Sequence, residues 1–344
     1  MAFKNMGTID GGTAVLGGAN RTGMPTMTLD AQGIASGGAF LISELAKRDN
    51  DLRKPLTSFT YPRDIVVEVG GGWADYVEGM SVQYGVTGSS GASLVQAGGS
   101  NGLPIVQASY DKGLFKAHAF AVALRVMWQD MQRANFVGRS LDQALQDGVR
   151  MAYDKHMDQN VYTGITEYGS TGLINDSGVT VTTAAAGAAT TTTWATKTPK
   201  EILKDVNDAI TAAWAAAEYD ESAIPNHIIM PYEQYTYILN TMVTDLAETT
   251  ILDYILKNNI AAKNGKQLFI GATRWCKGAG ASSKDRMVVY CNDRRFVKMD
   301  ELVPLSRAMT QPSATNFCYD TAYAANITEV QIFYPQTMLY VDGI

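Results

Sequence analysis

The feature that most constrains this chain is a pair of long extended segments joined by a glycine- and serine-rich tip. Residues 64–69 and 74–86 have the β-rich, alternating character of strands, with three glycines between them. The tip at 87–102 follows, and residues 103–126 are extended again. Two such strands predict a hairpin, which alone is only marginally stable in water. We therefore expect it to pack on the body of its own chain or across a neighbouring chain.

The N-terminal segment is rich in glycine. Nineteen of the 32 glycines lie in residues 1–102, and none lies between Ala188 and Asn264. Residues 1–40 alternate glycine with small polar residues, so they cannot bury enough apolar area to offset the entropy that ordering costs. We expect an unprocessed arm that is held by other protein, with two helical turns at 40–48.

The charge of the chain excludes several classes of protein. It carries 28 Lys and Arg against 34 Asp and Glu, a net charge of −6, so no overall basic field attracts nucleic acid or anionic lipid. Charged residues make up 18% of the chain, below the ~25% of ordinary soluble domains, and interface cores are depleted of charge in this way. The sequence has no apolar run long enough to span a membrane and no secretory signal. We expect a soluble, cytoplasmic chain with much of its surface against other protein.

The clearest helix follows the hairpin. Ser140 and Gln143 form a capping box, and Gly164 is a plausible C-terminal stop. Apolar or small residues recur at spacings of three and four between these ends, which predicts one buried stripe along the helix. The stripe consists of Leu141, Ala144, Leu145, Gly148, Val149, Ala152 and His156.

The rest of the chain mixes helices and strands without regular βαβ alternation. A second capping box at Thr198 and Glu201, with Pro199 in the first turn, opens another helix. Further strands are predicted at 226–230, 267–271, 286–291 and 325–341, and further helices at 231–239 and 246–262. This order predicts the α+β class.

Candidate catalytic and metal sites are weak. Ser100 lies in a G-x-S-x-G pattern, but a hydrolase needs that serine where a strand turns sharply into a helix, and here it lies in the hairpin tip. The histidines and cysteines have no metal-ligand spacing; they are His118, His156, His227, Cys276, Cys291 and Cys318. We expect no catalytic, cofactor-binding or metal site, and no cofactor.

Three groups of charged residues are further candidates for a site. The acidic pairs Asp75/Glu78 and Asp300/Glu301 are expected to be ordinary surface charges. Arg294 and Arg295 are flanked by acidic residues, which favours local ion pairing, with an intersubunit contact as the alternative.

The order of these parts resembles the major capsid proteins of tailed phages, the Hong Kong 97-type fold that encapsulin shells share. The resemblance rests on the long helix and its Gly-Leu-Ile-Asn exit at 138–176, on the strand, proline and helix at 227–238, and on MVVYCNDRRFVKM at 287–299. It implies a segment plan of an N-terminal arm (1–57), an extended loop with its base (58–120), a peripheral domain with a spine helix (121–199), an axial domain (200–309) and a return strand of the peripheral domain (310–344).

The resemblance also implies function and partners. A protein of this kind self-assembles into hexameric and pentameric capsomers of an icosahedral virion head, is assembled in the host cytoplasm, encloses double-stranded DNA contacted non-specifically, and touches no membrane. Portal and decoration or cement proteins are further implied partners, and scaffolding would be a separate protein or unnecessary. Two alternatives stay open from the sequence: an encapsulin-type compartment and, more remotely, a cytoplasmic hydrolase using Ser100.

One prediction concerns covalent locking of the shell. Some relatives join subunits by an isopeptide bond between a lysine of the extended loop and an asparagine of a neighbour, which requires an unprotonated amine near a carboxylate. Between Asp64 and Asp111 this chain has no lysine, and Lys112 and Lys116 lie at the base of the loop. We expect no cross-link, so denaturing electrophoresis of mature particles should give one band at 37.2 kDa. Ladders that survive boiling and reductant would contradict this.

Overall fold

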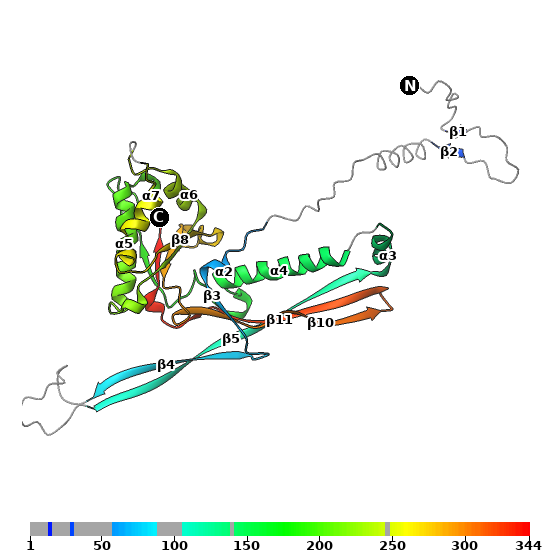
Figure 1. Ribbon diagram of the computed structural model, residues 1–344, viewed down its shortest axis with the longest axis horizontal. Coiled ribbons are helices and arrows are strands. Elements are labelled where there is room, and N and C mark those ends of the chain that lie inside the picture. Colours follow the sequence, from blue (N-terminus) through cyan, green and yellow to red (C-terminus); the bar gives the residue numbers. More distant parts are fainter. Residues whose placement is uncertain (1–12, 16–27, 31–56, 88–104, 138–140, 245–247) are drawn as a thin grey trace, which may run out of the picture. The chain divides into compact units, whose positions relative to one another are not determined.

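The computed structural model describes residues 57–87, 105–137, 141–244 and 248–344, together with two short strands near the N-terminus (Figure 1). The predicted helical turns at 40–48, the hairpin tip and the capping residue Ser140 lie outside the described residues. The chain divides into two compact units, residues 1–57 and residues 58–344. In the first unit, β1 (Thr13–Val15) pairs antiparallel with β2 (Thr28–Asp30).

The described part of residues 58–344 contains two sheets, of which the first is a five-stranded mixed sheet. Its strands are, in order, β6 (Thr180–Thr183), β13 (Leu339–Asp342), β9 (Arg286–Tyr290), β7 (His227–Met230) and β8 (Phe269–Ala272). In β7 every residue is buried, because Ile228 and Met230 face one hydrophobic core while Ile229 faces another. A strand covered on both faces reads as a continuous apolar run.

Four helices build the first of these cores. They are α5 (Pro199–Ala216), α6 (Tyr232–Asn240), α7 (Ile251–Asn258) and α8 (Ile260–Lys263). The predicted capping box of α5 is confirmed, since the Thr198 side chain accepts from the Glu201 N–H and the Glu201 carboxylate accepts from the Thr198 N–H. Its buried stripe includes Ile202, Val206 and Ile210, as predicted.

The prediction of one helix at 246–262 was wrong, because the helix is interrupted at Asn259. This residue has extended backbone dihedrals (φ −79°, ψ 158°) and its side-chain oxygen accepts from the Ala262 N–H at 2.7 Å. Its side-chain amide donates back to the carbonyl of Leu256 at 2.8 Å. One asparagine thus caps the end of α7 and the start of α8.

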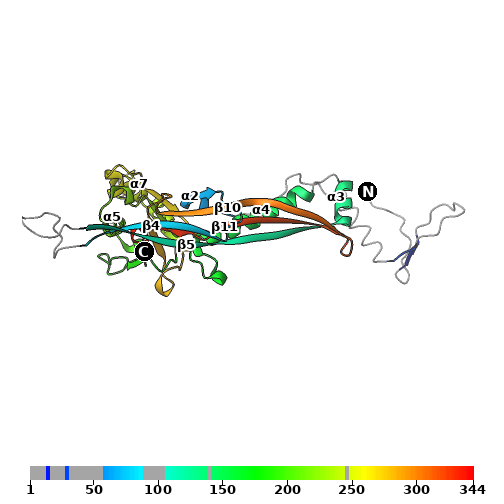
Figure 2. The ribbon, with the colours of Figure 1, turned by 90° about the horizontal axis from the view of Figure 1, so that it is seen from below.

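The second sheet is long and antiparallel, apart from one parallel strand. Its order is β12 (Gln331–Ile332), β10 (Val297–Ser313), β11 (Cys318–Thr328), β5 (Ile105–Met127) and β4 (Tyr76–Thr87), and β3 (Val66–Val69) pairs parallel with β10. Seen from below in Figure 2, β5 runs the length of this sheet, with β4 beside one half and β11 beside the other. The helix α3 (Trp128–Val137) follows β5 directly.

The long strand β10 was missed in the sequence because two prolines interrupt its pattern. A proline cannot donate to a sheet ladder, so it demotes a segment to an edge or a bulge. Pro304 lies in an irregular step of the β10–β11 register between Val303 and Ser306, and Pro312 pairs with Tyr319 near the end of the ladder. Both prolines of β10 thus lie where a sheet tolerates them, and the mixture of helices with two sheets confirms the predicted α+β class.

The helix α4 (Leu141–Thr163) lies along β5, β11 and β10 (Figure 1). Its buried side chains include Val149, Tyr153, Met157 and Val161, a strict i, i+4 stripe. Ala152, which was predicted to belong to the stripe, is exposed, because the buried side of the helix is rotated from the predicted one toward Tyr153 and Met157.

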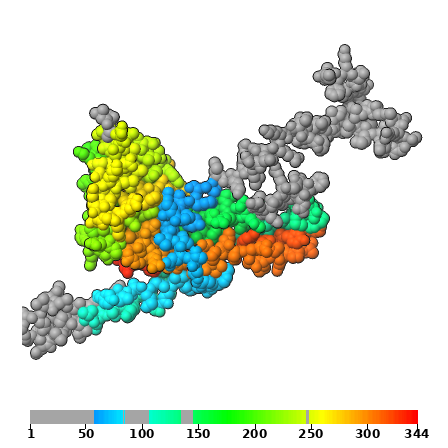
Figure 3. Space-filling view, in the orientation of Figure 1, coloured from blue at the N-terminus to red at the C-terminus, as the bar shows by residue number. Residues whose placement is uncertain are grey.

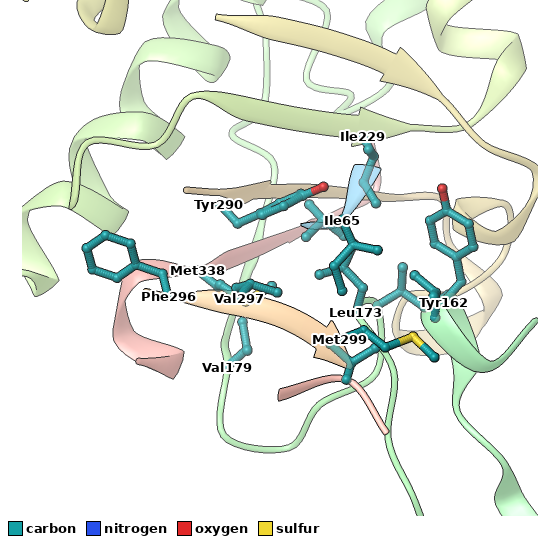
Figure 4. Close-up of a cluster of buried hydrophobic side chains, with 14 of the residues drawn as sticks. Ile65, Tyr162, Leu173, Val179, Ile229, Tyr290, Phe296, Val297, Met299 and Met338 are labelled. Carbon is teal, nitrogen blue, oxygen red and sulfur yellow. The ribbon is translucent and has the colours of Figure 1, made fainter. Parts of the chain in front are cut away.

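The predicted end of α4 at Gly164 is confirmed. This residue has φ +70°, and a Cβ there would lie 2.3 Å from the Ser170 carbonyl oxygen, so only glycine fits the turn. After this turn, residues 165–173 lead back along α4, and Leu173 packs in the second hydrophobic core. Figure 4 shows Leu173 and Tyr162 converging there with Ile65 and with Val297 of β10.

Truncation of Met157 tests this packing. The Met157 residue is 1% exposed, so Met157→Ala should lower the free energy of unfolding of the unassembled subunit by ~2–5 kcal/mol, since the cavity adds to the lost burial. Gln159→Ala, two residues along on the exposed side of the same helix, should change it by less than about 0.5 kcal/mol. Urea unfolding of both variants measures the difference, and equal effects would mean that the helix is rotated about its axis.

Candidate functional site

The hairpin of β4 and β5 has one apolar face. In an antiparallel pair, directly opposite residues lie on the same side of the ribbon. Val82 pairs with Tyr110 and Tyr84 pairs with Ala108, without any register shift along the hairpin. What we call the apolar face consists of Tyr76, Met80, Val82 and Tyr84 of β4 with Val106, Tyr110 and Leu114 of β5.

These apolar side chains are uncovered in the subunit. Each of the seven residues is between 40% and 77% exposed, and Tyr84 is the most exposed of them. An aromatic side chain alone offers ~150–250 Å² for burial, so the face offers several hundred Å². A monomer rarely exposes a larger continuous apolar patch, and such patches mark contacts with other protein. In Figure 3 the hairpin projects beyond the body of the subunit.

Beyond its base, where Val77 pairs with Phe115, the opposite side of the same hairpin is mainly small and polar. It carries the pairs Gly79/Gly113 and Ser81/Asp111, and Ser109 further out. In the outer part of the hairpin the alternation is therefore mainly apolar on one side and mainly polar on the other, as for a sheet with one buried face. Among the described residues, none covers the apolar side of this hairpin.

The apolar face continues into the body of the subunit, where the chain covers it itself. Further along β5 the same side of the strand carries Phe120 and Val126. The Phe120 ring lies 5.3 Å from the Tyr153 ring and 5.2 Å from the His156 ring, both on α4, and Val126 is 7% exposed. One strand face is thus covered by α4 in its second half and uncovered in its first half.

The root of the hairpin is tied to the body through a buried carboxylate. Asp64 ends the short helix α2 (Tyr61–Asp64), directly before β3. Its carboxylate is fully buried and accepts from the Arg63 guanidinium at 2.6 and 2.8 Å, from the Tyr162 hydroxyl of α4, and from His227 Nε2 of β7 at 3.1 Å. Burial alone would raise the pKa of Asp64, but the hydrogen bonds from His227, Arg63 and Tyr162 hold it below its usual value.

A second buried carboxylate strengthens the same junction. Asp158 of α4 accepts from the backbone N–H of Thr60 at 2.9 Å and of Tyr61 at 3.3 Å. It also accepts from the Trp275 indole at 2.7 Å. Together the two carboxylates connect residues 60–64 to α4 and to the five-stranded sheet.

The charges at the base of the hairpin are locally paired. Lys112 forms an ion pair with Glu78 on the same side of the ribbon as the apolar face, where Glu78 lies opposite Leu114 and Lys112 lies opposite Met80. The Lys116 backbone N–H donates to the Glu329 carboxylate at 3.0 Å. Both lysines lie in β5, as the sequence indicated, and Asp75 is exposed as expected.

The predicted histidine and serine candidates are separated in space or lie outside the described residues. Ser100 belongs to the tip that the structure does not describe. His118 stacks on Tyr168 with 4.6 Å between ring centroids, while His227 bonds to Asp64. Within the described residues there is no group of three side chains that could hold a metal ion, and Cys276, Cys291 and Cys318 are free, buried thiols.

The expectation that Asp300 and Glu301 are surface charges was wrong. Asp300 is 6% exposed and accepts from the Gln331 side-chain amide at 2.8 Å, with the Lys298 ammonium at 3.1 Å. The Glu301 carboxylate accepts from the Tyr153 hydroxyl at 2.6 Å. Both residues lie in β10, and the error follows from having missed that strand.

The expected local pairing is confirmed for Arg295, whose guanidinium lies 3.2 Å from the Asp293 carboxylate. Arg294 instead lies 3.9 Å from Glu68 of β3, which is distant in the sequence. Among the described helices, none has the length and hydropathy that crossing a membrane requires.

Comparison with known proteins agrees with this geometry. A family model described as major capsid protein matches residues 91–344. The capsid of Myoviridae phage XM1 superposes with a TM-score of 0.72 at 16% identity, covering 88% of this chain and 98% of that one. Microbacterium phage Oxtober96 gives 0.59 at 12% identity, covering 88% and 97%. Mycobacterium phage Cain gives 0.54 at 14% identity, covering 86% and 91%.

No curated protein sequence matches this chain. The family match nevertheless spans most of its length, and the similar solved structures share its fold over nearly all of theirs. The chain therefore belongs to the major capsid protein family and has the Hong Kong 97-type fold of tailed-phage capsids.

Proposed function

We propose that this capsid protein forms the hexamers and pentamers of an icosahedral phage head, and that the hairpin of each subunit lies with its apolar face on the next copy of the chain. The observation that carries this proposal is the apolar face itself, seven large residues that are 40–77% exposed on one side of one hairpin. Water is a poor environment for such a surface, and a second copy is the partner that a shell always provides.

The symmetry of the contact favours a ring. The apolar face lies on a projecting element, so it meets a different surface on its partner and the contact is heterologous. Heterologous contacts between identical chains close into rings when the rotation between copies permits it. Several hundred Å² from the hairpin alone approaches the ~800 Å² per partner of a stable interface, and the remaining area comes from the other surfaces of the subunit.

The segment plan fits this arrangement and remains part of the proposal. Residues 1–57 form the arm, and their separation from residues 58–344 as a compact unit supports that boundary. The hairpin corresponds to the extended loop and α4 to the spine helix. The axial domain at 200–309 corresponds to the sheet of β7, β8 and β9 with its helices, and β13 adds a strand to that sheet from the C-terminal segment.

The remaining partners follow from the same proposal. An acidic chain of net charge −6 suits a wall that confines double-stranded DNA without reading its sequence. Portal, scaffolding and decoration proteins would contact the assembled head, and assembly would take place in the host cytoplasm. The subunit would act as a structural protein and not as an enzyme.

Substitution of two tyrosines on the apolar face tests the proposal. Tyr84 and Tyr110 are 77% and 66% exposed, so Tyr84→Ser with Tyr110→Ser should leave the folded subunit intact. Loss of two aromatic contacts at an interface, each worth more than ~1 kcal/mol, should raise the protein concentration needed for assembly at least about tenfold. Sedimentation and electron microscopy of particles measure this, with thermal unfolding of the unassembled subunit alongside.

The matched control lies on the opposite side of the same hairpin. Ser81→Ala with Ser109→Ala changes two residues of the polar side and should leave assembly unchanged. If the tyrosine variant assembled at the wild-type concentration, the apolar face would not be an intersubunit contact, and the proposal would fail.

A further inference from the structure

A pair of glycines lies at the point where the hairpin leaves the body. Gly79 of β4 and Gly113 of β5 are directly opposite each other in the register. A strand glycine weakens the ladder and often marks the close approach of another group. Here the group is the ring of Phe333, because a Cβ added at Gly79 would lie 2.5 Å from the Phe333 Cε1 atom.

The two glycines differ in what surrounds them. At Gly113 an added Cβ would come no closer than 3.5 Å to a neighbouring atom, the Cε2 atom of Phe115, which is an ordinary contact. At Gly79 the nearest distance is below any that real Cβ atoms adopt. Of the two glycines, only Gly79 therefore provides the space in which the Phe333 ring lies.

Phe333 belongs to the body of the subunit. Its backbone N–H donates to the Phe296 carbonyl at 3.0 Å, and it directly follows β12, which pairs with β10. Its ring also meets the Phe115 ring of β5 edge-on, with 5.4 Å between centroids and an interplanar angle of 78°. One body residue thus contacts both strands of the hairpin on the polar side, opposite the apolar face.

A small change of strand direction at this contact produces a larger displacement at the outer end of the hairpin. Tyr84 lies five residues beyond Gly79, which at ~3.4 Å per residue is about 17 Å along the strand. A tilt of about 10° at the glycine pair would therefore move Tyr84 by about 3 Å, comparable with the spacing of packed side chains. A small displacement of the Phe333 ring becomes a change in where the apolar face meets its partner.

We propose that Phe333, seated against Gly79, is a positioning residue for assembly that sets the angle of the hairpin and so selects the geometry of the closed shell. The partner is a second copy of this chain, and the inference rests on the proposed function because it assumes that the apolar face contacts that copy. The ring does not itself touch the partner; it acts through the direction of β4 and β5.

The test compares Gly79→Ala with Gly113→Ala. Both replace a strand glycine by alanine, so both have the same intrinsic effect on the ladder. Gly79→Ala must displace the Phe333 ring, and we expect particles of altered diameter or open sheets from a subunit that melts within a few degrees of wild type. Gly113→Ala should give wild-type particles. Cryo-electron microscopy measures the diameters, and thermal unfolding monitors the subunit.

A double variant shows whether the effect passes through the ring. In a Phe333→Ala background the clash is gone, so adding Gly79→Ala should cause no further change in particle diameter. Should Gly79→Ala prevent folding, Phe333→Leu replaces it, with altered diameters expected and wild-type diameters overturning the inference.

The remaining outcomes separate this inference from the proposed function. Wild-type diameters from Gly79→Ala, with assembly still lost in the Tyr84 and Tyr110 variant, would overturn the role of Phe333 and leave the proposed function standing. Equal defects in Gly79→Ala and Gly113→Ala would also overturn it, because the cause would then be the loss of glycine flexibility. Normal assembly of the tyrosine variant would instead overturn the proposed function.

Discussion

The structure of the subunit depends on the buried carboxylate of Asp64. An ionised carboxylate without partners is very costly in a protein interior, so this site holds only because donors from α2, α4 and β7 meet at it. The Tyr290 hydroxyl of β9 also donates to the Asp64 backbone carbonyl. Because folding lowers the pKa of Asp64, its ionisation stabilises the fold above the unfolded-state pKa, and this contribution is lost as the pH falls through the folded-state pKa.

That junction fixes where the extended parts of the chain begin. β3 starts two residues after Asp64 and pairs with β10, and the chain then turns into β4. β5 returns along the hairpin and continues under α4 without a break. A strand that is continuous through both regions carries one apolar face, of which the subunit covers half. The uncovered half is a direct consequence of a strand that is longer than the helix packed on it, since β5 and α4 have 23 residues each and a strand rises about twice as far per residue.

The sequence predicted the parts of this fold that have local signals. The hairpin, the end of α4 at Gly164 and the capping box at Thr198 each depend on residues within a few positions of one another. β10 was missed because its prolines occupy a bulge and a ladder end, which only the paired strand reveals. The seat of Phe333 on Gly79 could not be predicted either, since the two residues lie near opposite ends of the described chain and meet only after both sheets have formed.

The hairpin has two opposing requirements: it must expose an apolar face, and it must not pair indiscriminately with other strands. The ion pair of Lys112 and Glu78 and the glycine pair bear on both. An exposed apolar ribbon with free edges invites indiscriminate strand pairing, and natural proteins limit this with charges on or beside such a ribbon. Lys112 and Glu78 supply charges within the inner part of the apolar face, while the outer part around Tyr84 and Tyr110 remains apolar. On the other side, Gly79 leaves the space in which the Phe333 ring lies. In the proposed assembly, one apolar face and the seat of Phe333 on Gly79 limit the ways in which a second copy can pack, and a closed shell needs that restriction more than it needs a stronger contact.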